Sequence, residues 1–542
     1  MSGSGGGAGR GGGGGEAPEP DPYDPDTVRT RHYGPRCDVT APVDAVIVHP
    51  GDDLQTAIDA AGPGGRLFLE AGSHRIAERL RFVDEQEIWG HCEAAITGSR
   101  IVDGFLQEGN NWVVAGAGSV EHSEPKCFVD DCSWSICDGG PGKSACQADG
   151  PGTCGTATCW RNQDLFLDGM RLRHTATRGE VEPGAWHYDY AQNEIVLGDD
   201  PQGHLVELSV LRELTEGYAD DLTLYNLTFR QFASASQRAA LRQFGNGLAI
   251  RDCEISDNHG AAVMIPTDGL IEGSRVVRNG QIGIGANQSL SAIVRFNEIA
   301  HNNPDGLYSS GFHAGGTKFV RTEDLLVEAN WVHDNGGTGL WTDIFNHRPT
   351  YLYNVCERNT DHGLSHEISY AARIEHNTMV DNHEAGIQIR SAGSLDGQVV
   401  VEGNHLQGNG KGIWVHQDAR RLENGSRNVV VRDNEVDQPG FDKATRCAEP
   451  GFDAGCCTGG YGCGHEGWGI ALGLRGAGVQ RCIDTGLCDG DAYYDGTYGN
   501  VFSGNDIALS EAGSSAFYWD YGTVDWGTWQ QAGNDADGSV SP

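Results

Sequence analysis

The chain has 542 residues, of which 80 are glycine and only 4 are methionine, a composition that suits a turn-rich β architecture better than a helical bundle. Its formal net charge of −38 at pH 7 produces a field that repels nucleic acid, so we expect no nucleic-acid partner. No run of apolar residues is long enough to cross a membrane, and we expect no transmembrane segment.

Residues 1–27 are expected to form a flexible tether, because the glycine- and serine-rich start and the proline- and acid-rich stretch after it cannot bury a core. The chain shows no apolar signal segment, yet its 16 cysteines indicate an oxidising compartment. We hypothesise that an export signal lies upstream of the given chain, since the tether resembles the linker after the lipid-bearing cysteine of bacterial surface lipoproteins. This implies a bacterial protein that is secreted or held at the cell surface or outer membrane by a lipid anchor.

Residues 28–120 are expected to begin the folded part of the chain. An aliphatic run at residues 46–48 predicts a first strand, and residues 51–61 predict a short amphipathic helix. Such a helix caps the open end of a stack of strands, whose edge would otherwise recruit other chains. Cys37 and Cys92 could pair close to this end.

Residues 121–160 and 441–498 are interpreted as loop insertions stapled by disulfides. Even numbers of cysteines in glycine-rich sequence favour disulfides over zinc, and neither segment contains a CxxC pair. Between the first insertion and the repeats, residues 161–215 predict a small β subdomain of short antiparallel strands, in which we place no catalytic residue. The clustered cysteines are Cys127, Cys132, Cys137, Cys146, Cys154 and Cys159, then Cys447, Cys456, Cys457, Cys463, Cys482 and Cys488.

Residues 216–440 carry a sequence repeat that predicts a solenoid, and residues 499–542 supply its last coils. Short aliphatic runs alternate with Asn, Asp and Gly turns, so the repeats are strands, and an asparagine in each coil can form a ladder of side-chain amides. An apolar residue follows each of these asparagines by two positions, and Cys253 and Cys356 are predicted to be core residues. The asparagines are Asn297, Asn330, Asn354, Asn377, Asn404, Asn434 and Asn505.

The predicted fold class is therefore all-β, a right-handed parallel β-helix with an N-terminal capping helix, a small inserted β subdomain and two disulfide-rich insertions. The pattern resembles the pectin-lyase-like superfamily over residues 45–110 and 216–535. The subdomain resembles the small β subdomain inserted in several β-helix glycosidases.

A line of polar residues recurs at one offset in the repeats. Counting 13 residues from Asn330, Asn354 and Asn377 gives Asp343, Glu367 and Arg390, and His416 follows one residue short of that offset. Alternation along a strand points these side chains outward on adjacent coils, about 4.8 Å apart. Two carboxylates this close favour one protonated and one ionised group, and a separation of about 5 Å is the geometry of retaining glycoside hydrolysis.

Further residues near this line are candidates for substrate contact. On the same outward face, two residues earlier in each coil, aromatic rings offer surfaces on which a sugar can stack. The 33-residue coil adds a segment expected to wall a cleft, and His366 is expected to point inward as a satisfied buried histidine. The candidate contacts are Tyr308, Trp341, Gln388 and Trp414 from the face, His313 and Lys318 from the added segment, Asn346 just after Asp343, and Arg390 and His416.

The sequences GLWTD and GLSHE, with Asp343 on one coil and Glu367 on the next, are similar to the arrangement in retaining β-helix glycoside hydrolases of the β-xylosidase and α-fucosidase types. The resemblance implies Asp343 as nucleophile and Glu367 as acid/base. We expect a monomer that acts on an extracellular polysaccharide or oligosaccharide and requires no cofactor.

Three alternatives remain open. In a polysaccharide lyase or uronate epimerase, Lys318, Arg390 and His416 would act on a uronate while Asp343 and Glu367 hold calcium. A non-catalytic surface protein that binds glycans or mediates adhesion would need only the tether and the stapled loops. The line of charges could also be a plain surface ladder of ion pairs, although two adjacent carboxylates would destabilise one.

Overall fold

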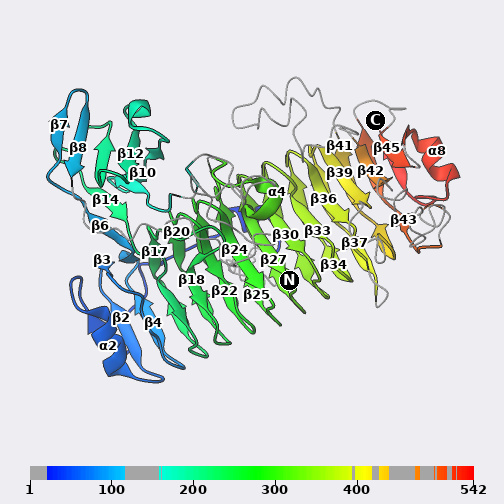
Figure 1. Ribbon diagram of the computed structural model, residues 1–542. Helices are drawn as coiled ribbons and strands as arrows, with labels where there is room; N and C mark the ends of the chain where they lie inside the picture. The colour runs from blue at the N-terminus through cyan, green and yellow to red at the C-terminus, as the bar shows by residue number, and fades with distance from the viewer. Residues whose placement is uncertain are drawn as a thin grey trace, which may run out of the picture.

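The computed structural model describes residues 21–115, 158–159, 161–304, 306–393, 397–417, 426–438, 470–475, 494, 497–509, 516–519 and 522–541. Most residues of the two cysteine-rich insertions and residues 1–20 of the tether lie outside these ranges. Figure 1 shows an elongated stack of coils with the small subdomain projecting near its N-terminal end. In the described part of the chain, no helix is both long and apolar enough for a membrane span.

Three long sheets run the length of the stack, and the chain visits them in turn, so that successive coils pair in parallel. The predicted all-β parallel β-helix is confirmed. Sheet 1 contains β1 (Val46–Val48), β2 (Arg66–Leu69), β4 (Glu87–Gly90), β16 (Thr223–Tyr225), β19 (Ala249–Arg251), β22 (Leu270–Glu272), β25 (Ile293–Arg295), β28 (Leu326–Glu328), β31 (Thr350–Leu352), β34 (Ala372–Glu375), β37 (Val399–Glu402), β40 (Val429–Arg432) and β43 (Val501–Ser503).

Sheet 2 follows sheet 1 in each coil. It contains β3 (Gly72–Arg75), β5 (Ala94–Thr97), β17 (Thr228–Arg230), β20 (Glu254–Ser256), β23 (Arg275–Val277), β26 (Glu298–Ala300), β29 (Trp331–His333), β32 (Val355–Glu357), β35 (Thr378–Val380), β38 (His405–Gln407), β41 (Glu435–Gln438), β44 (Asp506–Leu509) and β47 (Ser539–Ser541).

Sheet 3 completes each coil and carries the candidate site. It contains β15 (Thr215–Gly217), β18 (Ala239–Gln243), β21 (Ala261–Met264), β24 (Ile282–Asn287), β27 (Gly315–Val320), β30 (Leu340–Asp343), β33 (Leu364–Glu367), β36 (Ala385–Arg390), β39 (Lys411–His416), β42 (Ile470–Arg475), β45 (Phe517–Trp519) and β46 (Gly522–Val524). All pairs in sheet 3 are parallel except β45 with β46.

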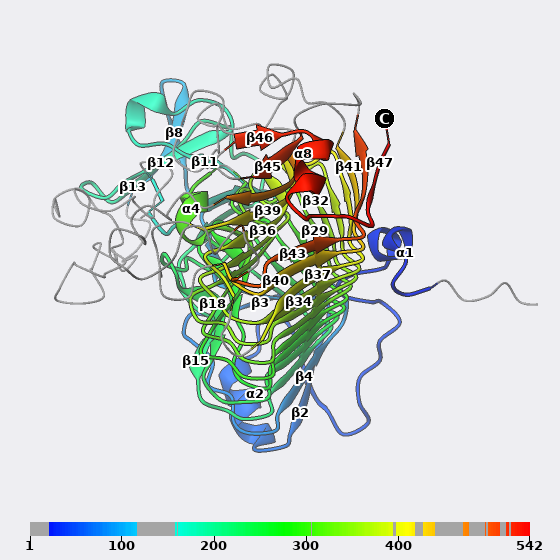
Figure 2. The same ribbon diagram turned by 90° about the vertical axis from the view of Figure 1, so that its right-hand side faces the viewer.

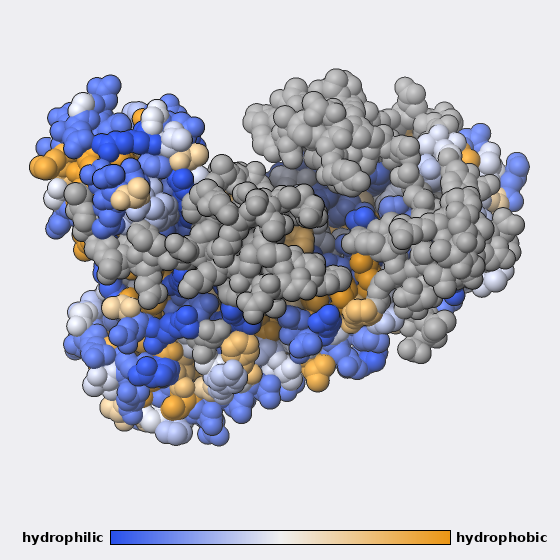
Figure 3. Space-filling view, viewed as in Figure 1, coloured by the Kyte–Doolittle hydropathy of each residue, from blue (hydrophilic) through white to orange (hydrophobic). Residues whose placement is uncertain are grey.

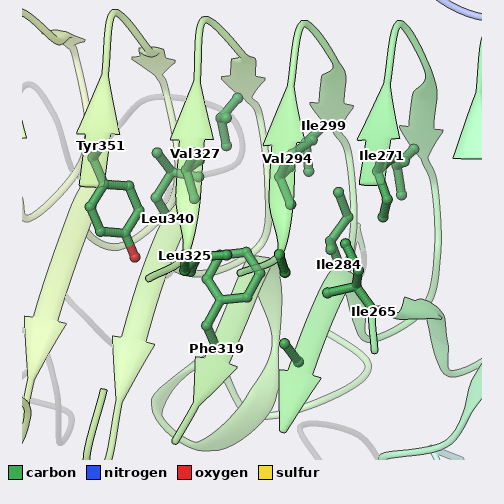
Figure 4. Close-up of a cluster of buried hydrophobic side chains, with 14 of the residues drawn as sticks. Ile265, Ile271, Ile284, Val294, Ile299, Phe319, Leu325, Val327, Leu340 and Tyr351 are labelled. Carbon is green, nitrogen blue, oxygen red and sulfur yellow. The ribbon is translucent and has the colours of Figure 1, made fainter. Parts of the chain in front are cut away.

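The core is filled by the inward-facing residues of the three sheets, which stack from coil to coil. Figure 4 shows this stacking, with Val294, Val327 and Tyr351 from sheet 1 facing Phe319 and Leu340 from sheet 3. Cys253 and Cys356 are buried free cysteines, as predicted.

Two asparagine ladders hold the turns between the sheets. In the predicted ladder, each side-chain amide donates to the next, as between Asn330 and Asn354 (2.9 Å) and between Asn354 and Asn377 (2.9 Å). A second ladder runs through the asparagines five residues later, for example from Asn335 to Asn359 at 2.9 Å. The ladder asparagines are almost completely buried, so these bonds satisfy polar groups inside the core and fix the register of the coils.

Helices cover both ends of the stack. The predicted capping helix is α2 (Leu54–Ala61), which begins at the N-cap residue Asp53 and buries Leu54 and Ile58. The other end carries α8 (Trp526–Gln531), whose Trp529 packs against Phe502 and Phe517. Sequence analysis did not anticipate this second cap.

The N-terminal segment lies along the flank of the solenoid. The helix α1 (Pro25–Thr30) begins inside the predicted tether, and its Val28 packs against Ala329 and Val355 beside sheet 2 (Figure 2). Farther along, Cys37 and Cys92 form the predicted disulfide.

The inserted subdomain is larger than expected, since strands assigned to the start of the β-helix belong to it. One sheet contains β6 (Ser99–Ile101), β14 (Val206–Ser209), β9 (Leu165–Leu167) and β10 (Met170–Arg171). The other contains β7 (Leu106–Glu108), β8 (Asn111–Ala115), β13 (Glu194–Leu197), β12 (Ala185–Asp189) and β11 (Arg173–His174), with the short 3-10 helix η1 (Arg178–Glu180). Cys159 is disulfide-bonded.

Candidate active site

The predicted line of polar residues exists in the structure as one column across sheet 3. Asp343 pairs with Glu367, Glu367 with Arg390, and Arg390 with His416 on successive parallel strands β30, β33, β36 and β39. We call this column the site file. His416 keeps the spatial register although its sequence offset is one residue short.

The backbone turns sharply directly after both carboxylates. Ile344 has φ 59° and Ile368 has φ 46°, and among the described residues they are the only β-branched residues with positive φ. This left-handed conformation costs an L-residue roughly 1–2 kcal/mol, and a β-branched residue there is an outlier. A positive φ recurs at the same turn of neighbouring coils, at Gln288, Arg321 and Ser391, so the branched side chains are what distinguish Ile344 and Ile368.

Both carboxylates are buried and each has a cationic neighbour. Lys318 Nζ lies 2.9 Å from Asp343 Oδ2, and the side chains of this pair are each only 8% exposed. Arg390 lies 3.5 Å from Glu367 Oε1. Asp343 Oδ1 is buried and has no hydrogen-bond partner within the described ranges.

Trp341 joins the two halves of the pair. Its indole nitrogen donates to Glu367 Oε2 at 3.1 Å, and Lys318 Nζ lies 3.5 Å above its ring. Trp341, predicted as a platform for a sugar, is 5% exposed and therefore orients the carboxylates and the lysine. The arrangement fixes both carboxylates through side chains that are themselves packed.

The residues directly before Asp343 and Glu367 point inward, as predicted. Thr342 and the buried His366 hydrogen-bond each other at 2.8 Å, and His366 also bonds the Tyr370 carbonyl at 2.7 Å. Burial lowers the pKa of His366 to about 4, so the ring is neutral near pH 7.

Several predicted contacts have other roles. The Asn346 amide donates to the backbone carbonyl of Asp343 at 2.9 Å, so it holds the strand end. Gln388 accepts from Ser365 at 3.0 Å. Trp414 packs against Ala385 and Tyr518.

The prediction for Tyr308 was wrong. Its ring is buried, and its hydroxyl donates to the Cys159 carbonyl at 3.0 Å. The strand that precedes β30 in sheet 3 is β27, so Lys318 precedes Trp341 in the outward column. The residues added in the 33-residue coil therefore come before β27 instead of after it. His313 lies in the short helix α4 (Ser310–His313), where burial and the nearby Lys318 charge lower the pKa of its imidazole to about 3.

A second group of charges, missed by sequence analysis, lies at the opening ends of the same strands. Burial raises the pKa of the Asp361 carboxyl to about 6, although Thr338 donates to it at 3.3 Å and opposes that shift. Lys411 and Glu384 form a buried ion pair at 2.8 Å. The signal was present, since counting seven residues from Asn354, Asn377 and Asn404 gives Asp361, Glu384 and Lys411.

A possible metal-binding group lies on sheet 2, apart from the site file. Ligand atoms of His301, His333 and Asp334 lie within 4.8 Å of one another. However, Arg358 binds both oxygens of Asp334, at 2.9 and 2.8 Å. Burial would lower the pKa of His333, but the carboxylates of Asp334 and Glu298 raise it. A proton and a guanidinium therefore already balance these carboxylates.

Two surface hollows lie elsewhere. One, of about 150 Å³, is lined by Arg79, Gln163 and Arg212 beside the subdomain. The other, of about 320 Å³, is lined by His405, Asp433 and Glu435. The second hollow also contains two carboxylates on adjacent strands, Glu435 and Asp506, but both are exposed. Burial and the neighbouring cations therefore distinguish Asp343 and Glu367 as the candidate site.

Comparisons with known proteins agree with this architecture. Residues 239–396 match the family model described as a right handed beta helix region. The chain folds as a right-handed parallel β-helix. No curated protein sequence matches it closely enough to count as a relative.

Solved structures resemble this β-helix at low sequence identity. XylC in complex with xylose is 11% identical with a TM-score of 0.49, over 86% of this chain and 83% of that one. An α-1,3-glucanase from Streptomyces thermodiastaticus is 10% identical with a TM-score of 0.47, over 94% and 70%. The A-module of the mannuronan C-5 epimerase AlgE6 of Azotobacter vinelandii is 12% identical with a TM-score of 0.44, over 90% and 94%.

Proposed function

We propose that this β-helix protein is a carbohydrate-active enzyme, a retaining glycoside hydrolase that uses Asp343 and Glu367. The observation that carries the proposal is their pairing on adjacent parallel strands, where both are buried and each lies beside a cation. The strand spacing of about 4.8 Å matches the separation of about 5–5.5 Å between the carboxyl groups of retaining enzymes.

Asp343 suits the role of nucleophile. Lys318 stabilises its negative charge at Oδ2. We assign the attack on the anomeric carbon to Oδ1, which is buried and has no hydrogen-bond partner among the described residues. In the first step, Oδ1 forms a bond to that carbon as the bond to the leaving oxygen breaks, and the Glu367 carboxyl gives its proton to that oxygen. In the second step, Glu367 takes a proton from water, which displaces Asp343.

The charges around the pair favour a neutral sugar. Lys318, Arg390 and Lys411, the three cations described beside the pair, face Asp343, Glu367 and Glu384 respectively. A uronate carboxylate would have to compete with these protein carboxylates and would meet Asp361 nearby. This balance supports hydrolysis of neutral glycans over binding of acidic ones.

A polysaccharide lyase or uronate epimerase is the second candidate, because Lys318, Arg390 and His416 lie on or beside the site file. In that case calcium would require the oxygens of Asp343 and Glu367, and Lys318 lies 2.9 Å from one of them. The ion pair therefore opposes the calcium-assisted version of this chemistry.

The test compares neutral aryl glycosides and neutral polysaccharides with uronate polymers, and records absorbance for unsaturated products. We expect turnover of a neutral substrate with retention of anomeric configuration by NMR. Replacing Glu367 by Gln should lower kcat by about 10²–10⁴, and replacing Asp343 by Asn should abolish turnover. The matched control Asp324→Asn changes an exposed acid and should retain activity. Unsaturated products, or full activity in both site variants, would refute the hydrolase.

We also propose that the protein is exported and acts outside the cytoplasm, on an extracellular glycan. The Cys37–Cys92 disulfide and the bonded Cys159 support an oxidising location. The hypothesis of a lipid-bearing cysteine upstream of the given chain is tested by growing the native host with a labelled fatty acid and asking whether the recovered full-length protein carries the label.

A further inference from the structure

The site file continues beyond Asp343 toward the N-terminal end of sheet 3. The pairing places Val320 beside Asp343 and Asn287 beside Val320. The registers of the next strand pairs, extended by one or two residues, place Pro266 beside Asn287, Phe244 beside Pro266 and Tyr218 beside Phe244. The same outward column that holds the two carboxylates therefore begins with two aromatic residues.

These two rings are exposed. Tyr218 is 77% exposed and Phe244 is 41% exposed, and the rings stack with centroids 5.1 Å apart and planes 24° apart. The described surface in Figure 3 is mainly hydrophilic. Because the ring face of Tyr218 that points away from Phe244 has so much free surface, the pair offers an open aromatic face to a ligand.

The polar surroundings of the pair suit a sugar. The guanidinium of Arg242 lies 4.6 Å from the centre of the Phe244 ring. Arg242 is the preceding outward-facing residue, two positions before Phe244. An aromatic face with a nearby hydrogen-bond donor matches the two faces of a pyranose, whose C–H groups stack while its hydroxyls accept hydrogen bonds.

The distance to the carboxylates fits a chain of several sugars. Phe244 is four strands before Asp343 in sheet 3, which at about 4.8 Å per strand is roughly 19 Å. Between them the site file contains only Pro266, Asn287 and Val320, and none of these carries a charge. An uncharged path suits the neutral glycan argued for above.

The subdomain is fixed along the opposite edge of this path. His259, just before β21, contacts Asp164 at 3.2 Å and the Cys159 carbonyl at 2.8 Å. Arg171 donates to the Asn258 carbonyl at 3.1 Å. These contacts tie the subdomain to the coils that lie between the aromatic pair and the carboxylates, so the outer face of sheet 3 is bordered there by a rigid neighbour.

We propose that Tyr218 and Phe244 form a remote subsite that stacks on a sugar ring of a neutral glycan whose reacting bond lies between Asp343 and Glu367. This inference rests on the proposed function, and it adds that the enzyme recognises an extended chain along the solenoid axis. The ligand is the substrate glycan itself, held about four coils from the bond that is cleaved.

The test measures binding by native affinity electrophoresis in gels containing arabinoxylan, galactomannan, xyloglucan or mixed-linkage β-glucan. At least one polymer should retard both the wild type and Glu367→Gln. Replacing Tyr218 or Phe244 by Ala should weaken that binding by about 2- to 12-fold. Tyr225→Ala is the matched control, since it removes an aromatic residue that packs against Trp89 in sheet 1 and should leave binding unchanged.

Kinetics separate this inference from the proposed hydrolase. The Tyr218→Ala variant should lose kcat/KM by the same factor on the polymer and keep wild-type kcat/KM on an aryl monoglycoside. If the polymer is cleaved equally well by this variant, the subsite is refuted and the hydrolase stands. If the pair is needed for binding but nothing is cleaved, the hydrolase is refuted and the subsite stands.

Two further results would overturn the subsite. One is the absence of retardation of the wild type in all four gels. The other is concentration-dependent self-association in sedimentation experiments that disappears in Tyr218→Ala, which would assign the aromatic pair to an interface between two copies of the chain. Because both rings are exposed, the melting temperatures of the variants should match that of the wild type.

Discussion

Removing the ammonium of Lys318 should strongly destabilise the protein, because it leaves the Asp343 carboxylate buried without a counter-charge. Both side chains are 8% exposed and their charged atoms are 2.9 Å apart. Breaking a buried ion pair by removing one partner costs about 3–5 kcal/mol. We therefore expect Lys318→Met, which keeps most of the apolar stem, to lower the free energy of unfolding by this amount at pH 7.

Urea unfolding followed by tryptophan fluorescence measures the loss. The double variant Lys318→Met with Asp343→Asn should recover most of it, since no unpaired charge then remains, although the Phe312 carbonyl also loses its bond from Lys318. The exposed pair between Arg348 and Asp324 is the control, and Arg348→Met should unfold close to the wild type. A loss below about 1 kcal/mol in Lys318→Met, well under the value for a buried pair, would mean that water reaches Asp343 and that the lysine does not hold it.

Three further predictions concern the scaffold and its pH dependence. Asn354→Ala removes hydrogen bonds to Asn377 and to the Val327 carbonyl, each 2.9 Å long. Each buried group left unpaired costs about 1–3 kcal/mol, so the melting temperature should fall by several degrees. Asn246→Ala, at an exposed turn, is the control and should leave the melting temperature unchanged. Replacing both Cys37 and Cys92 by Ser opens a loop with a sequence separation of 55 residues and should cost about 4 kcal/mol in urea unfolding; an unchanged midpoint would contradict this. Burial raises the folded pKa of Asp361 to about 6, so the contribution of this group to stability is complete below its unfolded pKa of about 4 and is lost as pH rises through 6. Asp361→Asn should therefore flatten the plot of unfolding free energy against pH between these two values. An unaltered slope would refute the assignment.

The fold and the site file were predictable because a parallel solenoid repeats its register. Asn330, Asn354 and Asn377 bond one another, so any residue at a fixed offset from them must stack as well. This is why Asp343 and Glu367 were found from spacing alone. The same reasoning at an offset of seven would have found Asp361 and Glu384.

The remaining errors arise where that register is interrupted. Gly306 and Leu307 imitate the glycine and aliphatic residue that open a strand, but β27 opens at Gly315, so Tyr308 was placed in a column that Lys318 occupies. The strand β8 pairs with β13 across the first cysteine-rich segment, and antiparallel pairing over such a separation leaves no periodic signal in the sequence.

Because the site file is straight, the distance between two of its positions is the number of coils between them multiplied by the strand spacing. Each coil adds one strand to sheet 3, so duplicating or deleting a coil between β18 and β30 would move the aromatic pair by about 4.8 Å relative to the carboxylates. No contact within either group would change. Under the proposed function and subsite, glycan length preference would be set by the number of repeats, which can change while Asp343 and Glu367 keep their contacts.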